Sequence, residues 1–232
     1  MTNKKTVLTG RKVRRPSTEV PILPSEEIAE ICSRANNQRD ACLVALLYLT
    51  GRRIEEVLPL RKQDFNVARP NFKIEESDYI VSFTTRNEKS WRREKQGKFN
   101  IPIVRKDKAT GEDGVFYYEK IEPSFSLLSP SGKILGPYVM NHLDSIYPHS
   151  YLFPPYKASG GDHINQPRAY QIIRKLDERL WLHAMRHLAF TRWAEVYKAN
   201  PTSMHELTFH KQFESTLKYI HDLEKKSRQR EI

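Results

Sequence analysis

Between residues 25 and 60 the hydrophobic positions recur at helical spacing. Ser25 is a good N-cap residue, and the apolar side chains that follow it fall on one stripe: Ile28, Ile31, Cys32 and Ala35. The next segment, residues 41–49 (ACLVALLYL), is apolar on nearly every side. This pattern predicts a helix at the centre of a bundle, and Gly51 is suited to end it in a left-handed conformation. A short third helix is expected in RIEEVLPL, residues 53–60.

The middle of the chain changes to a β pattern. Residues 78–85 (DYIVSFTT) and 97–104 (GKFNIPIV) alternate or are rich in β-branched and aromatic side chains, so we expect a hairpin, with a further strand near Phe72. The basic segment between them, residues 86–96, is predicted to be a long hairpin tip. Residues 106–135 are rich in Gly, Ser, Pro and charge, which indicates a surface excursion.

Helical patterns return after Pro137. They cover residues 138–147, 166–180 and 182–199, and two shorter helices are expected to follow, up to about residue 223.

The charge balance points to a polyanionic partner, for which nucleic acid is the usual choice. The chain of 232 residues has 39 Lys and Arg against 28 Asp and Glu, a formal net charge of +11 with a pI near 9.6. Residues 1–20 are especially basic and predict a flexible arm. Cys32 and Cys42 are expected to be reduced core residues in a cytosolic compartment. No apolar run approaches the roughly 18 residues of a membrane span, and the N-terminus lacks a secretory signal.

Three short motifs carry residues suited to phosphate chemistry. The first lies at the end of the apolar helix: Thr50, Gly51, Arg53 and Glu56. The second is His183 with Arg186, which lie three residues apart and so share a helix face. The third places His210 nine residues before Tyr219. Each motif alone is weak evidence, because the chain has eight histidines and eleven tyrosines.

Taken in order, these motifs resemble the catalytic domain of the tyrosine recombinase (phage integrase) family, over about residues 25–223. The resemblance implies an α+β fold, mainly α, with a small antiparallel sheet at one edge. It also implies that Tyr219 attacks a DNA phosphodiester, leaving a 3′-phosphotyrosyl link and a 5′-hydroxyl that can later reverse the reaction.

The resemblance implies a role for each motif residue. Arg53 and Arg186 would grip the non-bridging oxygens of the phosphate with their planar, permanently charged forks. His183 and His210 would donate to the same phosphate or manage the proton of Tyr219, whose pKa is near 10 when free. Glu56 is expected to have a supporting role, either orienting Arg53 or capping the chain locally, rather than a catalytic one.

The family also uses a lysine on the β-hairpin to protonate the leaving 5′-oxygen. Lys89, Lys95 and Lys98 are candidates, and Lys89 is favoured because it follows directly on the second strand, where the backbone is better fixed than at the tip. The same basic segment is expected to contact DNA phosphates through five side chains: Arg86, Arg92, Arg93, Lys95 and Lys98.

The sequence departs from the family pattern in three places. Arg52 stands where an apolar residue is usual, so the spacing to Glu56 must select Arg53 as the motif arginine. Phe209 replaces the glycine that usually precedes the third-motif histidine. The family's N-terminal DNA-clamping domain is not found, so we expect residues 21–232 to form a catalytic domain alone, as a fragment or a reduced member.

The resemblance implies site-specific recombination or integration on double-stranded DNA, with self-association on the DNA as a dimer or tetramer, no membrane, and a cytoplasmic location. No Asp, Glu and His cluster has metal-ligand spacing, so we expect no metal and no cofactor. Type IB topoisomerases and telomere resolvases share this chemistry and remain alternatives, as does a DNA-binding module without activity. The filled motif positions argue against the last.

Overall fold

The computed structural model describes residues 22–68, 80–156, 161–196, 202 and 208. The basic arm, the strand expected near Phe72 and the two short helices expected beyond residue 200 lie outside the described residues.

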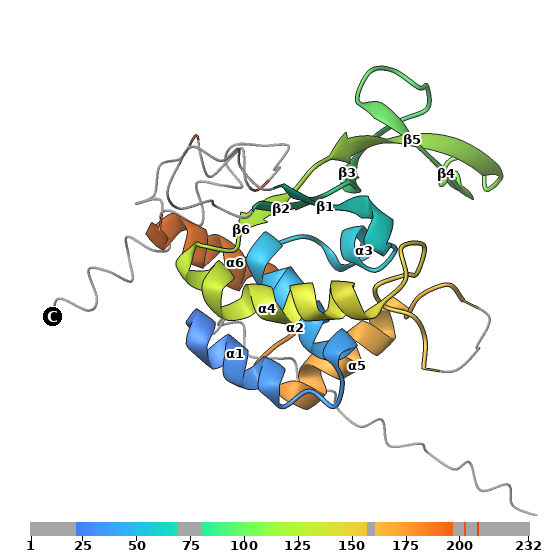
Figure 1. The fold of residues 1–232 in the computed structure, drawn as a ribbon. Coiled ribbons are helices and arrows are strands. Elements are labelled where there is room, and N and C mark those ends of the chain that lie inside the picture. The colour runs from blue at the N-terminus through green and yellow to red at the C-terminus, as the bar shows by residue number, and fades with distance from the viewer. Residues whose placement is uncertain (1–21, 69–79, 157–160, 197–201, 203–207, 209–232) are drawn as a thin grey trace, which may run out of the picture.

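A helical body surrounds the apolar helix α2 (Figure 1). Residues 42–48 of α2 are buried on every side, as the all-apolar pattern predicts, and α1, α4 and α6 pack against it. The longer helices of the body are α1 (Ser25–Ser33), α2 (Gln38–Thr50), α4 (Pro130–Ser145), α5 (Gln166–Leu176) and α6 (Leu182–Val196).

The ends of these helices follow local capping chemistry. The Asn37 side chain caps α2 by accepting from the backbone N–H of Asp40 (2.9 Å). The predicted cap of α1 is wrong, because the N-cap residue is Pro24 and Ser25 lies in the first turn. The Ser25 hydroxyl is hydrogen-bonded instead to the hydroxyl of Ser131 in α4 (2.6 Å), which ties the two helices together.

One small antiparallel sheet lies on the helical body. It has the order β1–β2–β6, formed by β1 (Phe65–Ala68), β2 (Ile80–Phe83) and β6 (Ser124–Ser126). Its inward residues, Val81, Phe83 and Phe125, join the same hydrophobic core as α2. The short helix α3 (Ile54–Val57) and a 3-10 turn (Lys62–Asp64) connect α2 to this sheet.

A second antiparallel sheet projects from the body (Figure 1). It has the order β3–β5–β4, and its strands are β3 (Thr85–Arg92), β4 (Phe99–Lys106) and β5 (Asp113–Ile121). Along β4 no side chain is buried, and partly covered positions alternate with exposed ones. The buried hydrophobic side chains of this sheet belong to its central strand β5: Phe116, Tyr118 and Ile121.

The middle of the chain differs from the sequence prediction. The two expected strands do not form a hairpin, because β2 pairs with β1 and β6, whereas β4 pairs with β5. Residues 86–92 of the expected tip continue strand β3. The expected excursion at 106–135 contains β5, β6 and the first turns of α4, which begins at Pro130 rather than after Pro137.

The α+β class is confirmed, with helices in the majority and the strands gathered at one edge of the body. The strands form two small sheets rather than the single sheet expected. Cys32 and Cys42 are both buried and unpaired, as expected for core thiols.

Candidate active site

Gly51 shapes the end of α2. Its backbone is left-handed (φ 56°), and its N–H donates to the carbonyl of Leu47 (2.9 Å). A Cβ at this position would lie 2.6 Å from Cε1 of Phe190 in α6. Glycine is thus required both by the turn and by the close approach of α6, and together they place the two following arginines against that helix.

The two adjacent arginines point in different directions. Arg52 is 1% exposed, whereas the Arg53 side chain is 22% exposed. Arg53 begins α3 as its N-cap residue, and its Nη1 donates to Oε1 of the fully buried Glu56 (2.9 Å), while its backbone N–H donates to Oε2 of the same carboxylate (3.0 Å). Glu56 therefore fixes both the backbone and the guanidinium of Arg53.

Helix α6 supplies His183 and Arg186 on one face. Arg186 is 3% exposed; its Nη1 donates to the carbonyl of Gly51 (2.5 Å) and its Nη2 to the carbonyl of Thr208 (3.3 Å). The guanidinium also lies over the ring of Phe190, 4.4 Å from its centroid. These contacts hold Arg186 at the end of α2, beside Arg52 and Arg53.

His183 lies at the exposed edge of this arrangement. Burial of the inner side of its ring, and then the positive charges of Arg186 and Arg53, hold the pKa of His183 below its ordinary value of 6.5. The ring is therefore neutral at pH 7 and able to accept a proton.

Strand β3 brings Lys89 to the same place. The pairing of β3 with β5 shifts register between Asn87 and Trp91, so Lys89 lies in an irregular stretch of the strand. The backbone N–H of Glu88 donates to Oε1 of Glu56 (3.2 Å), and that of Lys89 to Oδ1 of Asn87 (3.2 Å). The carboxylate that orients Arg53 thus also anchors the strand that carries Lys89.

These groups surround a cavity of about 410 Å³. It is lined by Arg52, Arg53, Ile54, Glu55, Glu88, Lys89, Gln166, Leu182, His183 and Arg186. Four of the six predicted catalytic residues, Arg53, Lys89, His183 and Arg186, are therefore brought together by segments far apart in the sequence. Cations outnumber carboxylates on the lining, which suits an anionic ligand.

Sequence reasoning missed Gln166 as a lining residue. It is the first residue of α5, directly after the N-cap Asn165. The helix start can be read from Asn165 and Pro167, but nothing in the sequence indicates that its first turn lies beside the two arginines. His210 and Tyr219, the remaining predicted catalytic residues, lie outside the described residues.

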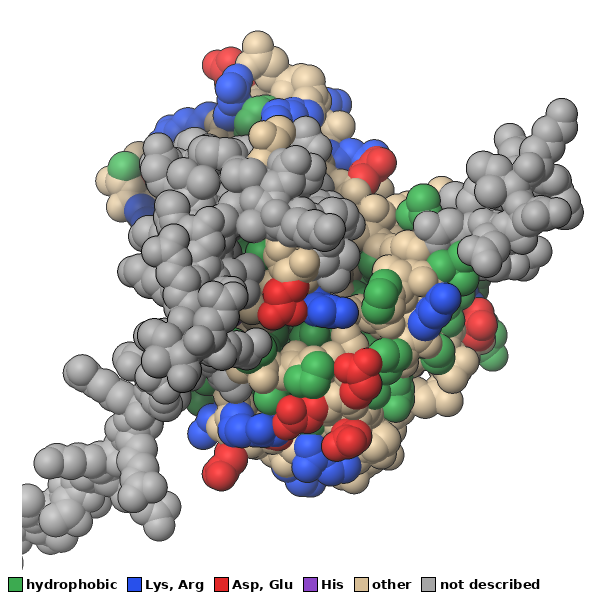
Figure 2. Space-filling view, turned by 90° about the vertical axis from the view of Figure 1, so that its left-hand side faces the viewer, with side chains coloured by type: hydrophobic (Ala, Val, Ile, Leu, Met, Phe, Trp, Pro, Cys, Tyr) green, Lys and Arg blue, Asp and Glu red, His purple; other side chains and the backbone are tan. Residues whose placement is uncertain are grey.

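The predicted DNA-contacting side chains lie along the projecting sheet and its turns rather than in the cavity lining. Three of them have carboxylate partners: Arg86 with Glu88, Arg93 with Asp107, and Lys98 with Glu119. Arg92 donates to the side chain of Gln96 (2.6 Å), and Lys95 is exposed. Figure 2 shows Lys and Arg side chains gathered over the upper part of the molecule, where this sheet lies.

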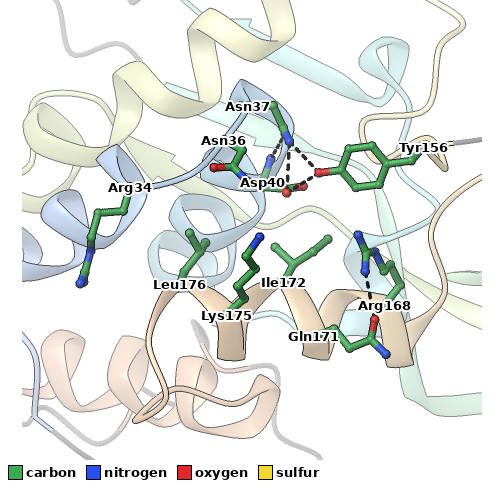
Figure 3. Close-up of a pocket in the computed structure, with 10 residues that line it drawn as sticks. All are labelled: Arg34, Asn36, Asn37, Asp40, Tyr156, Arg168, Gln171, Ile172, Lys175 and Leu176. Carbon is green, nitrogen blue, oxygen red and sulfur yellow. Dashed lines mark hydrogen bonds between the residues drawn. The ribbon is translucent and has the colours of Figure 1, made fainter.

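A larger cavity, of about 800 Å³, lies between the start of α2 and the face of α5 turned toward it (Figure 3). Its polar groups are bonded to one another: Asn37 Nδ2 donates to the Tyr156 hydroxyl (2.7 Å), which donates to Asp40 (2.7 Å). The guanidinium of Arg39 lies 3.9 Å from the centre of the Tyr156 ring. None of the four predicted catalytic residues that the structure describes lines this cavity, so we place the candidate site at the smaller one.

Comparison with solved structures identifies the architecture. The XerH site-specific recombinase bound to palindromic difH substrate, in a post-cleavage complex, aligns with a TM-score of 0.54 and 14% identity. The Tn1549 transposon integrase in complex with a circular intermediate DNA also aligns with a TM-score of 0.54 and 14% identity. This chain has the tyrosine recombinase catalytic-domain fold.

The alignment covers 88% of this chain in both comparisons, but 50% of the XerH chain and 62% of the Tn1549 integrase chain. The chain thus spans about half to three fifths of the length of these two recombinase structures. No family model matches the sequence, and the comparison with curated proteins finds no match.

Two further features concern the described residues alone. Within them, no group of three or more His, Cys, Asp and Glu is arranged to hold a metal ion. In the same part of the chain, no helix is long and apolar enough to cross a membrane.

Proposed function

We propose that this protein cleaves and rejoins DNA strands in site-specific recombination, through a 3′-phosphotyrosyl intermediate on Tyr219. The observation that carries the proposal is the convergence of Arg53, Lys89, His183 and Arg186 on one cavity. This convergence occurs in a fold shared with two recombinases solved on DNA.

In the proposed reaction the phenolate oxygen of Tyr219 attacks the phosphorus, and the bond from phosphorus to the 5′-oxygen breaks. Arg53 and Arg186 bind the non-bridging oxygens, where negative charge increases in the transition state. Removal of one such preorganised donor typically costs a factor of about 10²–10³ in rate. His183, neutral at pH 7, and His210 accept the tyrosine proton or donate to the phosphate. A 5′-hydroxyl then reverses the step and releases Tyr219.

The charge of the protein supports DNA as the partner. The formal net charge is +11, and the projecting β3–β5–β4 sheet carries Arg92, Arg93, Lys95 and Lys98 around the turn between β3 and β4. Phosphate contacts of this kind release counterions, so DNA affinity should fall steeply as salt rises. As the resemblance to tyrosine recombinases implies, we expect the protein to associate with itself on the DNA, as a dimer or tetramer.

The decisive test is a covalent adduct on a nicked duplex, from which the cleaved fragment diffuses away and traps the intermediate. Tyr219→Phe should abolish the SDS-resistant adduct while leaving DNA affinity nearly unchanged, because one hydroxyl is lost without a change of charge. The matched control is Tyr147→Phe, at a tyrosine that is 83% exposed and is not part of the cavity lining, and this variant should retain the adduct. If Tyr219→Phe still forms the adduct, Tyr219 is not the nucleophile.

Lys89 is proposed as the general acid for the leaving 5′-oxygen. It lines the cavity with the arginines, whereas Lys95 and Lys98 do not, and Lys98 pairs with Glu119 at 2.5 Å. With a substrate whose 5′-bridging oxygen is replaced by sulfur, the thiolate leaves without a proton. Lys89→Ala should therefore be slow on the ordinary duplex and restored on the sulfur substrate. If Lys95→Ala shows the rescue instead, Lys95 is the acid.

A further inference from the structure

Arg52 is a buried cation that the proposed chemistry does not use. It is 1% exposed, and burial lowers its pKa to about 10, so it is charged at neutral pH. Its Nε donates to the carbonyl of Thr50 (3.1 Å), and its Nη1 lies 3.9 Å from Oε2 of Glu56. A buried charge is costly, so a side chain kept in this position calls for a specific role.

The third contact of Arg52 reaches across the chain. Its Nη2 donates to the carbonyl of Thr208 (3.2 Å), 156 residues away in sequence, and Arg186 donates to the same oxygen (3.3 Å). Thr208 is itself fully buried. Two guanidiniums, one just after the end of α2 and one within α6, therefore hold one carbonyl, which lies two residues before His210 and eleven before Tyr219.

We propose that Arg52 is a positioning residue that fastens the segment carrying His210 and Tyr219 to the arginine pair, through the carbonyl of Thr208. This inference rests on the proposed function for the identity of the nucleophile, but the fastening itself does not. Arg186 connects the phosphate site and the Thr208 carbonyl, and Arg52 supplies the second hydrogen bond to that oxygen. Direct contact with the phosphate is the competing role, because Arg52 also lines the cavity, and the substrate experiment below separates the two.

The substitutions Arg52→Leu and Arg52→Lys separate geometry from charge. Leucine fills the buried volume with an apolar side chain, and lysine keeps the cation but loses the planar fork that serves several acceptors at once. If Arg52 acts by geometry, both variants should lose about 10²-fold in the rate of adduct formation, as a misplacement of about 1 Å can cause. DNA affinity should stay within about twofold of the parent.

Hydrogen exchange measures the fastening without any activity. In both variants, amides in peptides spanning residues 208–219 should exchange at least tenfold faster, while α2 keeps its protection. Arg39→Leu is the matched control, because Arg39 is also buried and donates to a distant carbonyl, that of Pro154 (2.5 Å), away from the cavity. It should leave exchange in residues 208–219 unchanged.

A neutral methylphosphonate at the scissile position tests the competing role. Loss of an arginine that neutralises the phosphate should be partly restored on this substrate, so Arg53→Ala should gain and Arg52→Leu should not. Rescue of Arg52→Leu, near-parental adduct formation by Arg52→Lys, or unchanged exchange in residues 208–219 would each overturn the proposal. If the parent forms no adduct, the proposed function fails, and the exchange comparison still decides whether Arg52 holds the segment.

Discussion

The helical body and the projecting sheet contribute to the same cavity, but they differ in how far their charged side chains are buried. In the body, α2 is buried on nearly every side. The body also contains three buried charged residues that are held by specific partners: Arg52, Glu56 and Arg186. In the β3–β5–β4 sheet the charged groups are mostly exposed, and Val104 is 68% exposed. Geometry is therefore enforced by packing in the body and by backbone pairing in the sheet.

The two regions meet at Glu56. Its carboxylate binds Arg53 and the backbone of Glu88, and its own carbonyl accepts a hydrogen bond from the Thr85 hydroxyl (2.6 Å). The base of β3 is thus fastened to α3 close to Lys89, while the far end of the sheet lies away from the body (Figure 1). This explains how an exposed sheet can present one side chain accurately to a rigid site.

The largest expected difference is in the unfolding free energy lost when a carboxylate of the body or of the sheet is neutralised. Glu56→Gln removes the charge opposite two buried or half-buried arginines, and breaking a buried pair in this way costs about 3–5 kcal/mol of unfolding free energy. Glu119→Gln, in the sheet, breaks a pair whose lysine is 66% exposed, and this should cost about 1 kcal/mol or less. Denaturant unfolding of both variants measures the difference. Equal losses would show that the body does not hold its charges more tightly than the sheet.

A second pair of variants compares two left-handed glycines. Gly51 and Gly97 have φ of 56° and 53°, but a Cβ at Gly51 would meet the buried Phe190, whereas nothing lies within 4 Å of one at Gly97. Gly97→Ala should cost about 1–2 kcal/mol of backbone strain. Gly51→Ala should add about 1–3 kcal/mol for overpacking against α6.

The measurement is again the free energy of unfolding in denaturant. Similar costs for the two glycine variants would mean that α6 yields to the added methyl group and that the end of α2 is less rigid than its contacts imply.

The same contrast explains which parts of the fold could be predicted. The helices of the body are readable because burial imposes an apolar stripe or an all-apolar run, as in residues 41–49. Strand β3 has no hydrophobic alternation, because its two buried side chains, Thr85 and Asn87, are polar, so its charges look like those of a loop. Strand β5, GVFYYEKI, does carry a β signal, but the Gly, Ser and Pro around it conceal the strand when residues 106–135 are considered together. It pairs with β4 as the next strand of the chain, but its pairing with β3 is long-range, and local pattern does not determine it.

The residues of the candidate site also differ in whether the sequence could predict them. Spacing to Glu56 selects Arg53 rather than Arg52 as the motif arginine, because Glu56 at the third position of α3 can reach back to the helix start. Both arginines line the cavity, and Arg53 is the more exposed. The contact of Arg52 with Thr208 joins residues 156 apart and could not be read from spacing. Gln166 was missed for the same reason, since its neighbours in the cavity come from α3, β3 and α6.

The smallest expected effect is a change in the pKa of His183, which depends on burial and on the positive charges beside the cavity. Its pKa is below 6.5 because of burial first and then the charges of Arg186 and Arg53, so the folded state binds fewer protons there than the unfolded state. Stability from this group is complete above pH 6.5 and falls as the pH drops from there toward the lowered pKa. Arg53→Ala should raise the pKa of His183 toward 6.5, whereas Arg93→Ala, which removes a cation from the exposed sheet, should leave it where it is. NMR titration of the imidazole ring measures each value directly. If the two substitutions shift the pKa of His183 equally, the effect comes from net charge rather than from the arginine that the body places beside it.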